Sequence, residues 1–413
     1  MSERLRVAMV TTFYPPYNFG GDGHAIRRLA HALVRRGHHV EVIHDVDAYW
    51  LSAKGPEPAP AVEPEGLRVH GLRSRLGSLA CLATQQSGYP LVHGRTIRRI
   101  LAQGFDVIHY HNISLIGGPG ILAYGHAVKL YTAHEHWLVC PTHVLWRHNR
   151  ELCTKRECLR CVVRYRRPPQ LWRLTSLLER KSRHIDAFLS LSDFSARKHA
   201  EFGFGLPMRP MPTFIEDTGT ARPRTATDTA IPPYFLFVGR LERIKGLQDV
   251  IPSFLGEGVS ELWIAGTGDF EAELRRIAGG AARVKFLGHL SPGRLTELYR
   301  DAVAAVIPSV CYEVFPMVVL EAFREATPII GRALGPFPEI IEKSQGGLLF
   351  ESRAELETAL NLLATNPARR DEFGRAGFRA FREYWEESVA IDKYFGIIRE
   401  IASRRGLQLG GRA

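Results

Sequence analysis

The sequence predicts an α/β protein with two doubly wound domains that follow one another along the chain. Its 413 residues exceed what a single hydrophobic core usually supports. Strand-like and helix-like segments alternate in two successive series, a pattern typical of parallel sheets that carry helices on both faces. Between the two series, residues 217–233 replace apolar periodicity with Asp, Thr, Gly, Pro and Arg, and they form the predicted linker.

The first series gives a predicted domain at residues 1–216. It opens with a strand, a glycine-containing loop and a helix with an apolar stripe, and Gly37 ends that helix. The expected strands lie at 7–12, 40–44, 107–110, 129–133 and 187–192, and the first helix lies at 25–36.

The second series gives a predicted domain at residues 234–385. Ser291 and Pro292 supply a helix cap and a first-turn proline, which fixes the start of one helix. An amphipathic helix is expected near the end of the chain, at about 386–405. The strands are expected at 234–238, 261–265, 284–287 and 304–307, and the helices at 247–254, 270–278 and from 292 onward.

The positive charge is concentrated in one segment. The chain has a formal net charge of +11, and residues 143–183 hold 12 Lys and Arg against three Glu, an excess of nine. Such a segment favours anionic membrane surfaces, phosphate-bearing acceptors or nucleic acid, although no base-stacking motif of a recognised kind accompanies it. No stretch reaches the ~20 apolar residues of a membrane span, and a strand rather than a secretory segment opens the chain. We therefore expect a cytoplasmic protein that associates with membranes at most peripherally.

Four of the six cysteines are clustered within this part of the chain. Cys140, Cys153, Cys158 and Cys161 include one C-x2-C pair, and in a cytosolic chain clustered thiols indicate metal more often than disulfides. They predict a structural Zn–S4 site, with His143 and His148 as spare ligands. The alternative is four reduced thiols, because the spacing differs from that of standard zinc fingers.

Two carboxylates lie eight positions apart at a predicted junction between a loop and a helix. Pro316 suits the first position of the helix, which places Glu313 in the loop and Glu321 a turn or more into an apolar helix. The helix N-terminus beside them offers free N–H groups to a phosphate. The bland alternative is a solvated pair of glutamates, but the layout could also hold sugar hydroxyls and a diphosphate together.

A second motif makes the resemblance to a known family specific. Directly after the strand at 234–238 come Gly239, Arg240, Lys245 and Gly246, in the pattern G-R-x4-K-G. Together with E-x7-E downstream, this pattern resembles glycosyltransferase family 4, whose members are retaining, nucleotide-sugar-dependent enzymes of the GT-B fold. The likeness runs through almost the whole chain. It implies two Rossmann-like domains facing a central cleft, an acceptor-binding first domain completed by the final helix, and a donor-binding second domain.

The resemblance also implies roles for the second-domain residues. Arg240 and Lys245 would bind the donor diphosphate, and Glu321 would accept hydrogen bonds from ribose hydroxyls. Glu313 would face the donor sugar and the distal phosphate. The N–H groups of Val314 and Phe315 would help it, and Gly266, which ends another strand, would lie beside the nucleotide.

In the first domain the resemblance points to a glycine loop and a histidine. Gly20 and Gly21 would let backbone amides approach the donor phosphates, and His134, after the strand at 129–133, would contact a donor hydroxyl or the acceptor. His109 and His111 are assigned no function. We expect no catalytic divalent metal.

The sequence therefore predicts a retaining glycosyltransferase with a UDP-sugar donor, favoured over a GDP-sugar by family frequency. The acceptor is left open among a glycan, a lipid-linked sugar and a small molecule. A nucleotide-sugar 2-epimerase on the same fold is the first alternative. A basic, zinc-stabilised nucleic-acid-binding protein is the second, but it would leave most of the chain unused.

Overall fold

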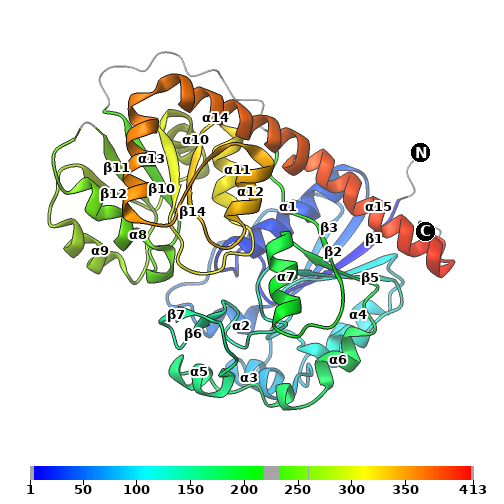
Figure 1. Cartoon of the computed structure of the whole chain (residues 1–413). Helices are drawn as coiled ribbons and strands as arrows, with labels where there is room; N and C mark the ends of the chain where they lie inside the picture. Colours follow the sequence, from blue (N-terminus) through cyan, green and yellow to red (C-terminus); the bar gives the residue numbers. More distant parts are fainter. Residues whose placement is uncertain (1–3, 218–231, 259, 411–413) are drawn as a thin grey trace. The chain divides into compact units, whose positions relative to one another are not determined.

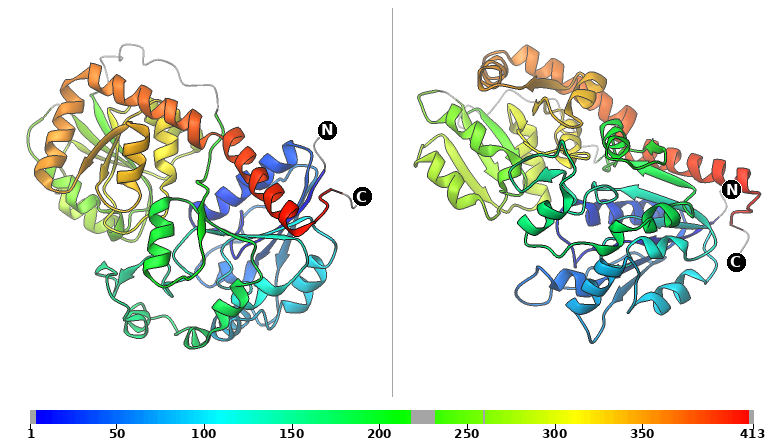
Figure 2. Two further views of the ribbon diagram at one scale, coloured as in Figure 1. Left: turned by 45° about the vertical axis from the view of Figure 1, so that its right-hand side comes forward. Right: turned by 60° about the horizontal axis from the view of Figure 1, so that its bottom comes forward.

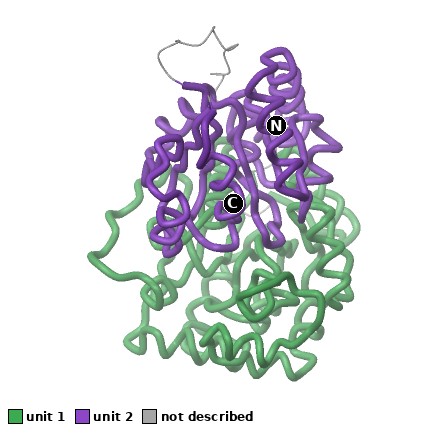
Figure 3. The backbone as a smooth tube through the Cα atoms, turned by 60° about the vertical axis from the view of Figure 1, so that its left-hand side comes forward, with its two compact units in different colours: residues 1–212, 390–413 green, residues 213–389 purple. Residues whose placement is uncertain are grey.

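The computed structural model describes residues 4–217, 232–258 and 260–410. The chain forms two compact units (Figure 3): unit 1 comprises residues 1–212 and 390–413, and unit 2 comprises residues 213–389. Most of the predicted linker lies outside the described residues.

Unit 1 is built on a seven-stranded parallel sheet with the order β3-β2-β1-β4-β5-β8-β9. Figure 1 labels β1, β2, β3 and β5 of this sheet. The strand order reverses at β1, which pairs with β2 on one side and β4 on the other. In doubly wound sheets, ligands bind at the carboxyl ends of the strands beside such a reversal. The strands are β1 (Arg6–Val10), β2 (His39–Asp45), β3 (Leu67–Leu72), β4 (Val107–Tyr110), β5 (Val128–Ala133), β8 (Ala187–Ser190) and β9 (Met208–Pro210).

The strand residues of unit 1 are apolar on both faces of the sheet, and helices therefore cover the sheet. Ala8 and Val10 of β1 belong to one core cluster with Ile97 and Ile100 of α4, while α1 contacts β2 and β3. The helices are α1 (Gly21–Arg35), α2 (Val46–Trp50), α3 (Ser78–Ser87), α4 (Gly94–Leu101), α6 (Leu177–Ser182) and α7 (Asp193–Glu201), with a 3₁₀ helix at Pro119–Ala123.

The cysteine-rich segment has little regular structure. It contains a two-stranded antiparallel pair, β6 (Trp146–Arg147) and β7 (Glu151–Leu152), then α5 (Cys158–Arg164) and a 3₁₀ helix at Leu171–Leu174. These short elements connect β5 to α6.

Unit 2 has a six-stranded parallel sheet with the order β12-β11-β10-β13-β14-β15, so its order reverses at β10. The strands are β10 (Tyr234–Val238), β11 (Glu261–Ala265), β12 (Val284–Gly288), β13 (Ala304–Ile307), β14 (Ile329–Arg332) and β15 (Gly347–Phe350). The helices are α8 (Leu247–Val250), α9 (Glu271–Ala278), α10 (Pro292–Asp301), α11 (Met317–Arg324), α12 (Phe337–Ser344), α13 (Arg353–Thr365) and α14 (Pro367–Ala380), with 3₁₀ helices at Arg243–Lys245 and Ile251–Phe254 and a π-helical turn at Phe381–Trp385.

Two predicted helix boundaries in unit 2 need correction. The helix expected at 247–254 divides into α8 and a 3₁₀ helix, and Pro252, which has no N–H to donate, lies in the second part. Helix α11 begins at Met317 rather than Pro316, whose backbone is extended with a ψ of 117°. The Pro316 carbonyl accepts the N–H of Val319 at 3.1 Å, so this proline is the N-cap residue. The expected cap of α10 by Ser291 is present.

The last helix, α15 (Glu387–Arg405), carries the chain from unit 2 into unit 1. Its Tyr394, Ile398 and Ile401 are fully buried, and the Tyr394 hydroxyl lies 3.2 Å from His109 Nδ1 of β4. Arg405 forms an ion pair with Asp186 at 2.7 Å. Figure 2 shows the end of this helix beside the first elements of unit 1. The final helix therefore contributes to the packing of unit 1.

Candidate active site

In unit 2, the two sequence motifs meet at the reversal of the strand order. The G-R-x4-K-G motif follows β10, and the segment that contains Glu313 follows β13, the neighbour of β10 in the sheet. Both segments thus leave the carboxyl edge of the sheet at one place, where doubly wound sheets bind ligands.

Two glycines allow the loops at this edge to approach one another closely. A Cβ atom at Gly266 would lie 1.9 Å from the carbonyl oxygen of Gly239, so only glycine fits between the turns after β10 and β11. Gly246 has a φ of +76°, and a Cβ atom there would lie 2.0 Å from the carbonyl oxygen of Pro308. The glycines therefore bring the Lys245 loop against the end of β13.

Lys245 and Glu313 form an ion pair at the centre of this site. Lys245 Nζ donates to Glu313 Oε1 at 2.7 Å, and Ser309 Oγ donates to the same oxygen at 2.8 Å. Burial disfavours both charges, but the opposite charge prevails: the pKa of Lys245 is raised and the pKa of Glu313 is lowered. Both groups are therefore ionised at neutral pH. Ser309 is a site residue that the sequence reasoning missed.

Arg240, the second expected phosphate ligand, lies on the surface of the same loop. Its guanidinium pairs with Glu242 at 2.5 Å, and 61% of the side chain is exposed. The two cations expected to bind diphosphate thus each have a carboxylate partner, so a diphosphate would have to share them. Arg240 can do so readily because exposed ion pairs contribute little stability.

Glu321 projects from α11 and is held by a buried tyrosine. The Tyr299 hydroxyl of α10 donates to Glu321 Oε2 at 2.9 Å. Burial and the neighbouring Glu321 charge raise the pKa of Tyr299, so this hydroxyl stays protonated and remains a donor. Val314 and Phe315 connect Glu313 to Pro316, which supplies no side-chain cap to the first turn of α11. Tyr299 was not found by sequence reasoning, because only packing brings α10 beside α11.

In unit 1, His134 is one of three histidines in contact at the carboxyl ends of β4 and β5. His111 Nδ1 lies 3.0 Å from His134 Nε2, and the rings of His109 and His111 have centroids 3.9 Å apart. His109 Nε2 lies 2.8 Å from the Thr132 hydroxyl. His109 and His111, which the sequence left without a function, are thus neighbours of the predicted site residue.

All three imidazoles are neutral at pH 7. Burial lowers the pKa of His109 to about 3 and that of His134 to about 4, and it holds the pKa of His111 well below its ordinary value. Charge repulsion between the rings acts in the same direction for His109 and His111. The row can therefore donate and accept hydrogen bonds without carrying charge.

The glycine pair lies at the start of α1, one residue from a perturbed carboxyl group. Gly20 is the N-cap residue and α1 begins at Gly21. Burial, followed by the charge of Glu135, raises the pKa of the adjacent Asp22 to about 6. Asn112, which follows His111, donates to Asp22 Oδ2 at 3.5 Å. The glycines, Asp22 and the histidine row thus share the edge formed by β1, β4 and β5.

The four clustered cysteines line one small cavity in the cysteine-rich segment. Cys140 and Cys161 are buried, Cys153 is half-buried and Cys158 is exposed. Among the described residues, one group of three or more possible metal ligands has all of its ligand atoms within 4.8 Å of one another. The four cysteines are not that group. No three of the four sulfur atoms therefore lie mutually within 4.8 Å, whereas the edges of a Zn–S4 tetrahedron are about 3.8 Å. The spare ligands His143 and His148 are paired with carboxylates, at 2.6 and 2.8 Å.

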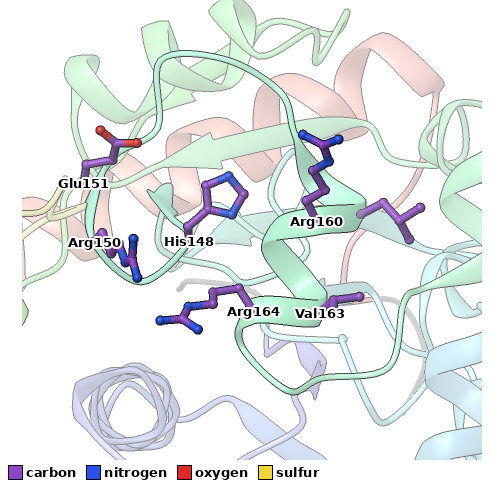
Figure 4. A pocket seen from close by; sticks show the side chains of 7 residues that line it. His148, Arg150, Glu151, Arg160, Val163 and Arg164 are labelled. Carbon is purple, nitrogen blue, oxygen red and sulfur yellow. The ribbon is translucent and has the colours of Figure 1, made fainter.

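The same segment carries an open basic pocket on α5 and the β6–β7 turn (Figure 4). Leu159 and Val163 are 67% and 63% exposed, and the pocket is lined by His148, Arg150, Glu151, Leu159, Arg160, Val163 and Arg164. No helix within the described residues has both the length and the apolar character needed to cross a bilayer.

Comparison with known families accounts for both units. Residues 20–212 match the glycosyl transferase 4-like domain, and residues 225–380 match glycosyl transferases group 1. The chain is 26% identical to a glycogen synthase of Mycobacterium tuberculosis over 407 residues, which cover 90% of this chain and 89% of the relative. It is 25% identical to a phosphatidyl-myo-inositol mannosyltransferase of Mycobacterium leprae, with coverage of 97% and 98%.

Solved structures show the same fold. Sucrose-phosphate synthase from Thermosynechococcus elongatus has a TM-score of 0.72 at 19% identity, covering 97% of this chain and all of that one. HepE of Anabaena in complex with UDP has a TM-score of 0.66 at 15% identity, with coverage of 96% and 100%. The chain is therefore an enzyme, a glycosyltransferase of the family 4-like class with the GT-B fold.

Proposed function

We propose that this glycosyltransferase transfers a sugar from a UDP-sugar with retention of anomeric configuration. The arrangement of Lys245, Glu313 and Ser309 at the strand-order reversal of unit 2 carries the proposal. UDP is favoured over GDP because the similar Anabaena protein has been solved with UDP and with UDP-glucose.

The ion pair explains how two adjacent loops could serve both ends of the breaking bond. Lys245 has two further ammonium hydrogens for the leaving diphosphate, and Arg240 adds a second cation. Both hydrogen bonds to Glu313 fall on Oε1, which leaves Oε2 for the donor sugar. The lowered pKa keeps this carboxylate negative beside the positive charge that develops at the anomeric carbon. Glu321 would accept from the ribose hydroxyls while Tyr299 fixes its orientation.

The proposed chemistry uses no enzyme nucleophile. The acceptor oxygen bonds to the anomeric carbon on the face from which the diphosphate departs, and the departing phosphate oxygen takes the acceptor proton. In unit 1, the neutral His134 would hydrogen-bond a donor hydroxyl or the acceptor, and Gly20 and Gly21 would let backbone amides approach the phosphates. The acceptor is a glycan, a lipid-linked sugar or a small molecule.

The test is to incubate the purified protein with a panel of UDP- and GDP-sugars and candidate acceptors. Mass spectrometry identifies the transferred sugar, and proton NMR of the fresh product gives its anomeric configuration. We expect turnover with a UDP-sugar and the anomer of the donor. An inverted product would contradict retention, and turnover with GDP-sugars alone would contradict the choice of nucleotide.

We further propose that Cys140, Cys153, Cys158 and Cys161 bind a structural zinc ion after a small contraction of their loop. Their common cavity supports this, and one ion would order a segment with few apolar residues. Elemental analysis of protein purified without a metal-affinity tag should give zinc that Cys158→Ser loses. Retention of all of the zinc by Cys158→Ser, or four freely titratable thiols in the wild type, would contradict the site.

The basic pocket supports a last element of the proposal, peripheral binding to anionic membranes. Arginines surround two exposed apolar side chains, a combination that suits a charged lipid surface. Sedimentation with vesicles should show binding to phosphatidylglycerol-containing membranes that falls with salt and with Arg160→Glu/Arg164→Glu. Arg276→Glu, on an exposed helix of unit 2, is the control. Equal binding of the two variants would contradict a role for this pocket.

A further inference from the structure

Two buried carboxylates and a histidine lie together at the carboxyl end of β2 in unit 1. Asp45 ends β2, Asp47 lies in the first turn of α2, and His93 immediately precedes α4. Their exposed fractions are 1%, 7% and 7%. One ligand atom from each lies within 4.8 Å of the other two, and this is the metal-type group noted above among the described residues.

His93 is the observation that separates this group from an ordinary acidic cluster. Its side chain is nine-tenths buried, and within the described residues Nε2 makes no hydrogen bond of ordinary geometry. The nearest Asp47 oxygen, Oδ2, lies 3.5 Å away, which is longer than the roughly 2.7–2.9 Å of a charged hydrogen bond. Two ligands of one tetrahedral ion at about 2.0–2.2 Å stand about 3.3–3.6 Å apart, so the observed separation fits a shared ion.

The charges of the site also call for a cation. Two carboxylates are buried side by side, and among the ion pairs found within the described ranges, neither has a Lys or Arg partner. Their other contacts are neutral: Asp45 Oδ1 accepts from the Ala48 N–H at 3.1 Å, and Asp47 Oδ2 accepts from the N–H and hydroxyl of Ser74, each at 2.8 Å. Buried like charges are unfavourable unless a cation or a proton neutralises them.

A proton is the competing solution, and the structure shows where it would go. Burial raises the pKa of Asp45 to about 7, so this carboxyl would be partly protonated at neutral pH without a cation. A proton on Asp45 would nevertheless leave His93 Nε2 without a partner. A cation satisfies all three groups at once.

We propose that Asp45, Asp47 and His93 bind one divalent cation of the zinc class. Carboxylate oxygens with an imidazole nitrogen form a ligand set that such ions use, and a water molecule completes the coordination. The Cys81 thiol, 3.8 Å from Asp45 Oδ2, is the next nearest group. The ion would tie the start of α2 to the turn at Ser74 and to the start of α4. It is distinct from the cysteine cluster and does not rest on the proposed donor or acceptor.

The experiment must separate this ion from any ion held by the cysteines. Cys158→Ser/Cys161→Ser removes the thiolate cluster and leaves the three ligands intact. Chelator-treated protein of this background is titrated with Zn²⁺ alone, and bound metal is counted by elemental analysis after gel filtration. We expect one equivalent per chain. Less than about half an equivalent at micromolar free Zn²⁺, a concentration that would saturate a site of the strength typical of structural zinc, would overturn the proposal.

Substitutions in the same background identify the ligands. His93→Gln should weaken Zn²⁺ binding at least about 100-fold, because it removes a direct ligand, and Asp47→Asn should do the same. His70→Gln is the matched control, since His70 also pairs with a carboxylate in unit 1, Glu41 at 2.7 Å, without belonging to the metal group.

Hydrogen exchange of the full-length wild type is a second measurement, which does not depend on whether the substituted proteins fold. Zn²⁺ should slow amide exchange in α2 and at the start of α4 beyond any effect on the cysteine-rich segment. Unchanged exchange there, or unchanged zinc affinity in His93→Gln, would show that His93 and Asp47 form a simple ion pair.

Discussion

The two units share one architecture but stabilise their polar edges in opposite ways. At the strand-order reversal of unit 2, Lys245 and Glu313 are both charged because they lie 2.7 Å apart. At the corresponding edge of unit 1, no carboxylate forms an ion pair with His109, His111 or His134 among the described residues, and burial keeps these histidines neutral. Of the 17 histidines in the chain, only His289 belongs to unit 2. A buried side chain thus stays charged only where an opposite charge lies beside it.

The largest effect is expected from removing the charge of Glu313. Glu313→Gln keeps an acceptor for Lys245 and Ser309 but takes away the negative charge beside the reacting sugar. Turnover should fall about 100- to 1,000-fold, the range for losing one preorganised electrostatic contact, with little change in UDP affinity. Steady-state kinetics and calorimetry with UDP measure the two effects separately.

The control for this variant is Glu261→Gln. Glu261 also pairs with a lysine of unit 2, Lys285 at 2.7 Å, at the start of β11 and away from the motif loops. Equal turnover of Glu313→Gln and Glu261→Gln would show that the charge of Glu313 has no part in the reaction.

The next effect concerns the other half of the pair. Lys245→Ala removes a charged donor from the proposed diphosphate and leaves Glu313 without its counter-ion. UDP binding should weaken by about 1.5–3 kcal/mol, the range for a hydrogen bond to a charged group. Lys285→Ala is the matched control. Unchanged affinity of Lys245→Ala for both UDP and GDP would remove this residue from the donor site.

Acid should destabilise unit 1 at a higher pH than unit 2. The histidines of unit 1 have lowered pKa values in the folded state, so between about pH 6.5 and pH 4 the unfolded chain binds protons that the folded chain does not. The stability that these histidines contribute to unit 1 is therefore lost as the pH falls through this window, by about 1.4 kcal/mol per pKa unit for each such group. Glu313 has a lowered pKa, and the stability it contributes is present above its ordinary pKa near 4.5 and lost only below it.

Hydrogen exchange of the full chain, corrected for intrinsic rates, tests this difference at pH 7, 6 and 5. Peptides from β4 and β5 should lose protection before peptides from β10 and β13. The glutamine of His109→Gln can still hydrogen-bond Thr132 and Tyr394 but does not titrate. This variant should therefore lose less exchange protection in unit 1. Equal loss of protection in both units would contradict the assignment of the neutral histidines.

The sequence was informative where chemistry and fold are local. The alternation of strands and helices predicted both sheets, and G-R-x4-K-G with E-x7-E pointed to one edge of unit 2, because each motif lies within a short continuous stretch of the chain. The boundary at Pro316 was wrong by one residue, since proline suits either the cap or the first turn and only the extended ψ decides between them.

The sequence was less informative where a site is assembled from distant strands. His111 and His134 lie 23 residues apart, and Asp22 and Asn112 lie 90 apart. Nothing in the local pattern distinguishes His111, Asp22 or Asn112 from core or surface residues, and His134 was singled out only by its position and the family resemblance. Their relation follows from the parallel register of β1, β4 and β5, which sequence periodicity does not specify.

The smallest effect is expected from His134. Its imidazole is neutral, so His134→Ala removes an uncharged hydrogen bond, which is worth about 0.5–1.5 kcal/mol. Transfer should therefore fall only about 2- to 10-fold while UDP binding stays unchanged. Burial holds the pKa of His134 at about 4. The transfer rates of the wild type and of His134→Ala should therefore have the same pH dependence near pH 6.5. His136→Ala, another buried histidine of unit 1, is the control for packing. A wild-type transfer rate in His134→Ala would exclude contact with the reacting groups. A loss far beyond 10-fold would instead mean that this imidazole carries charge during the reaction, and the contrast between the two units would then fail.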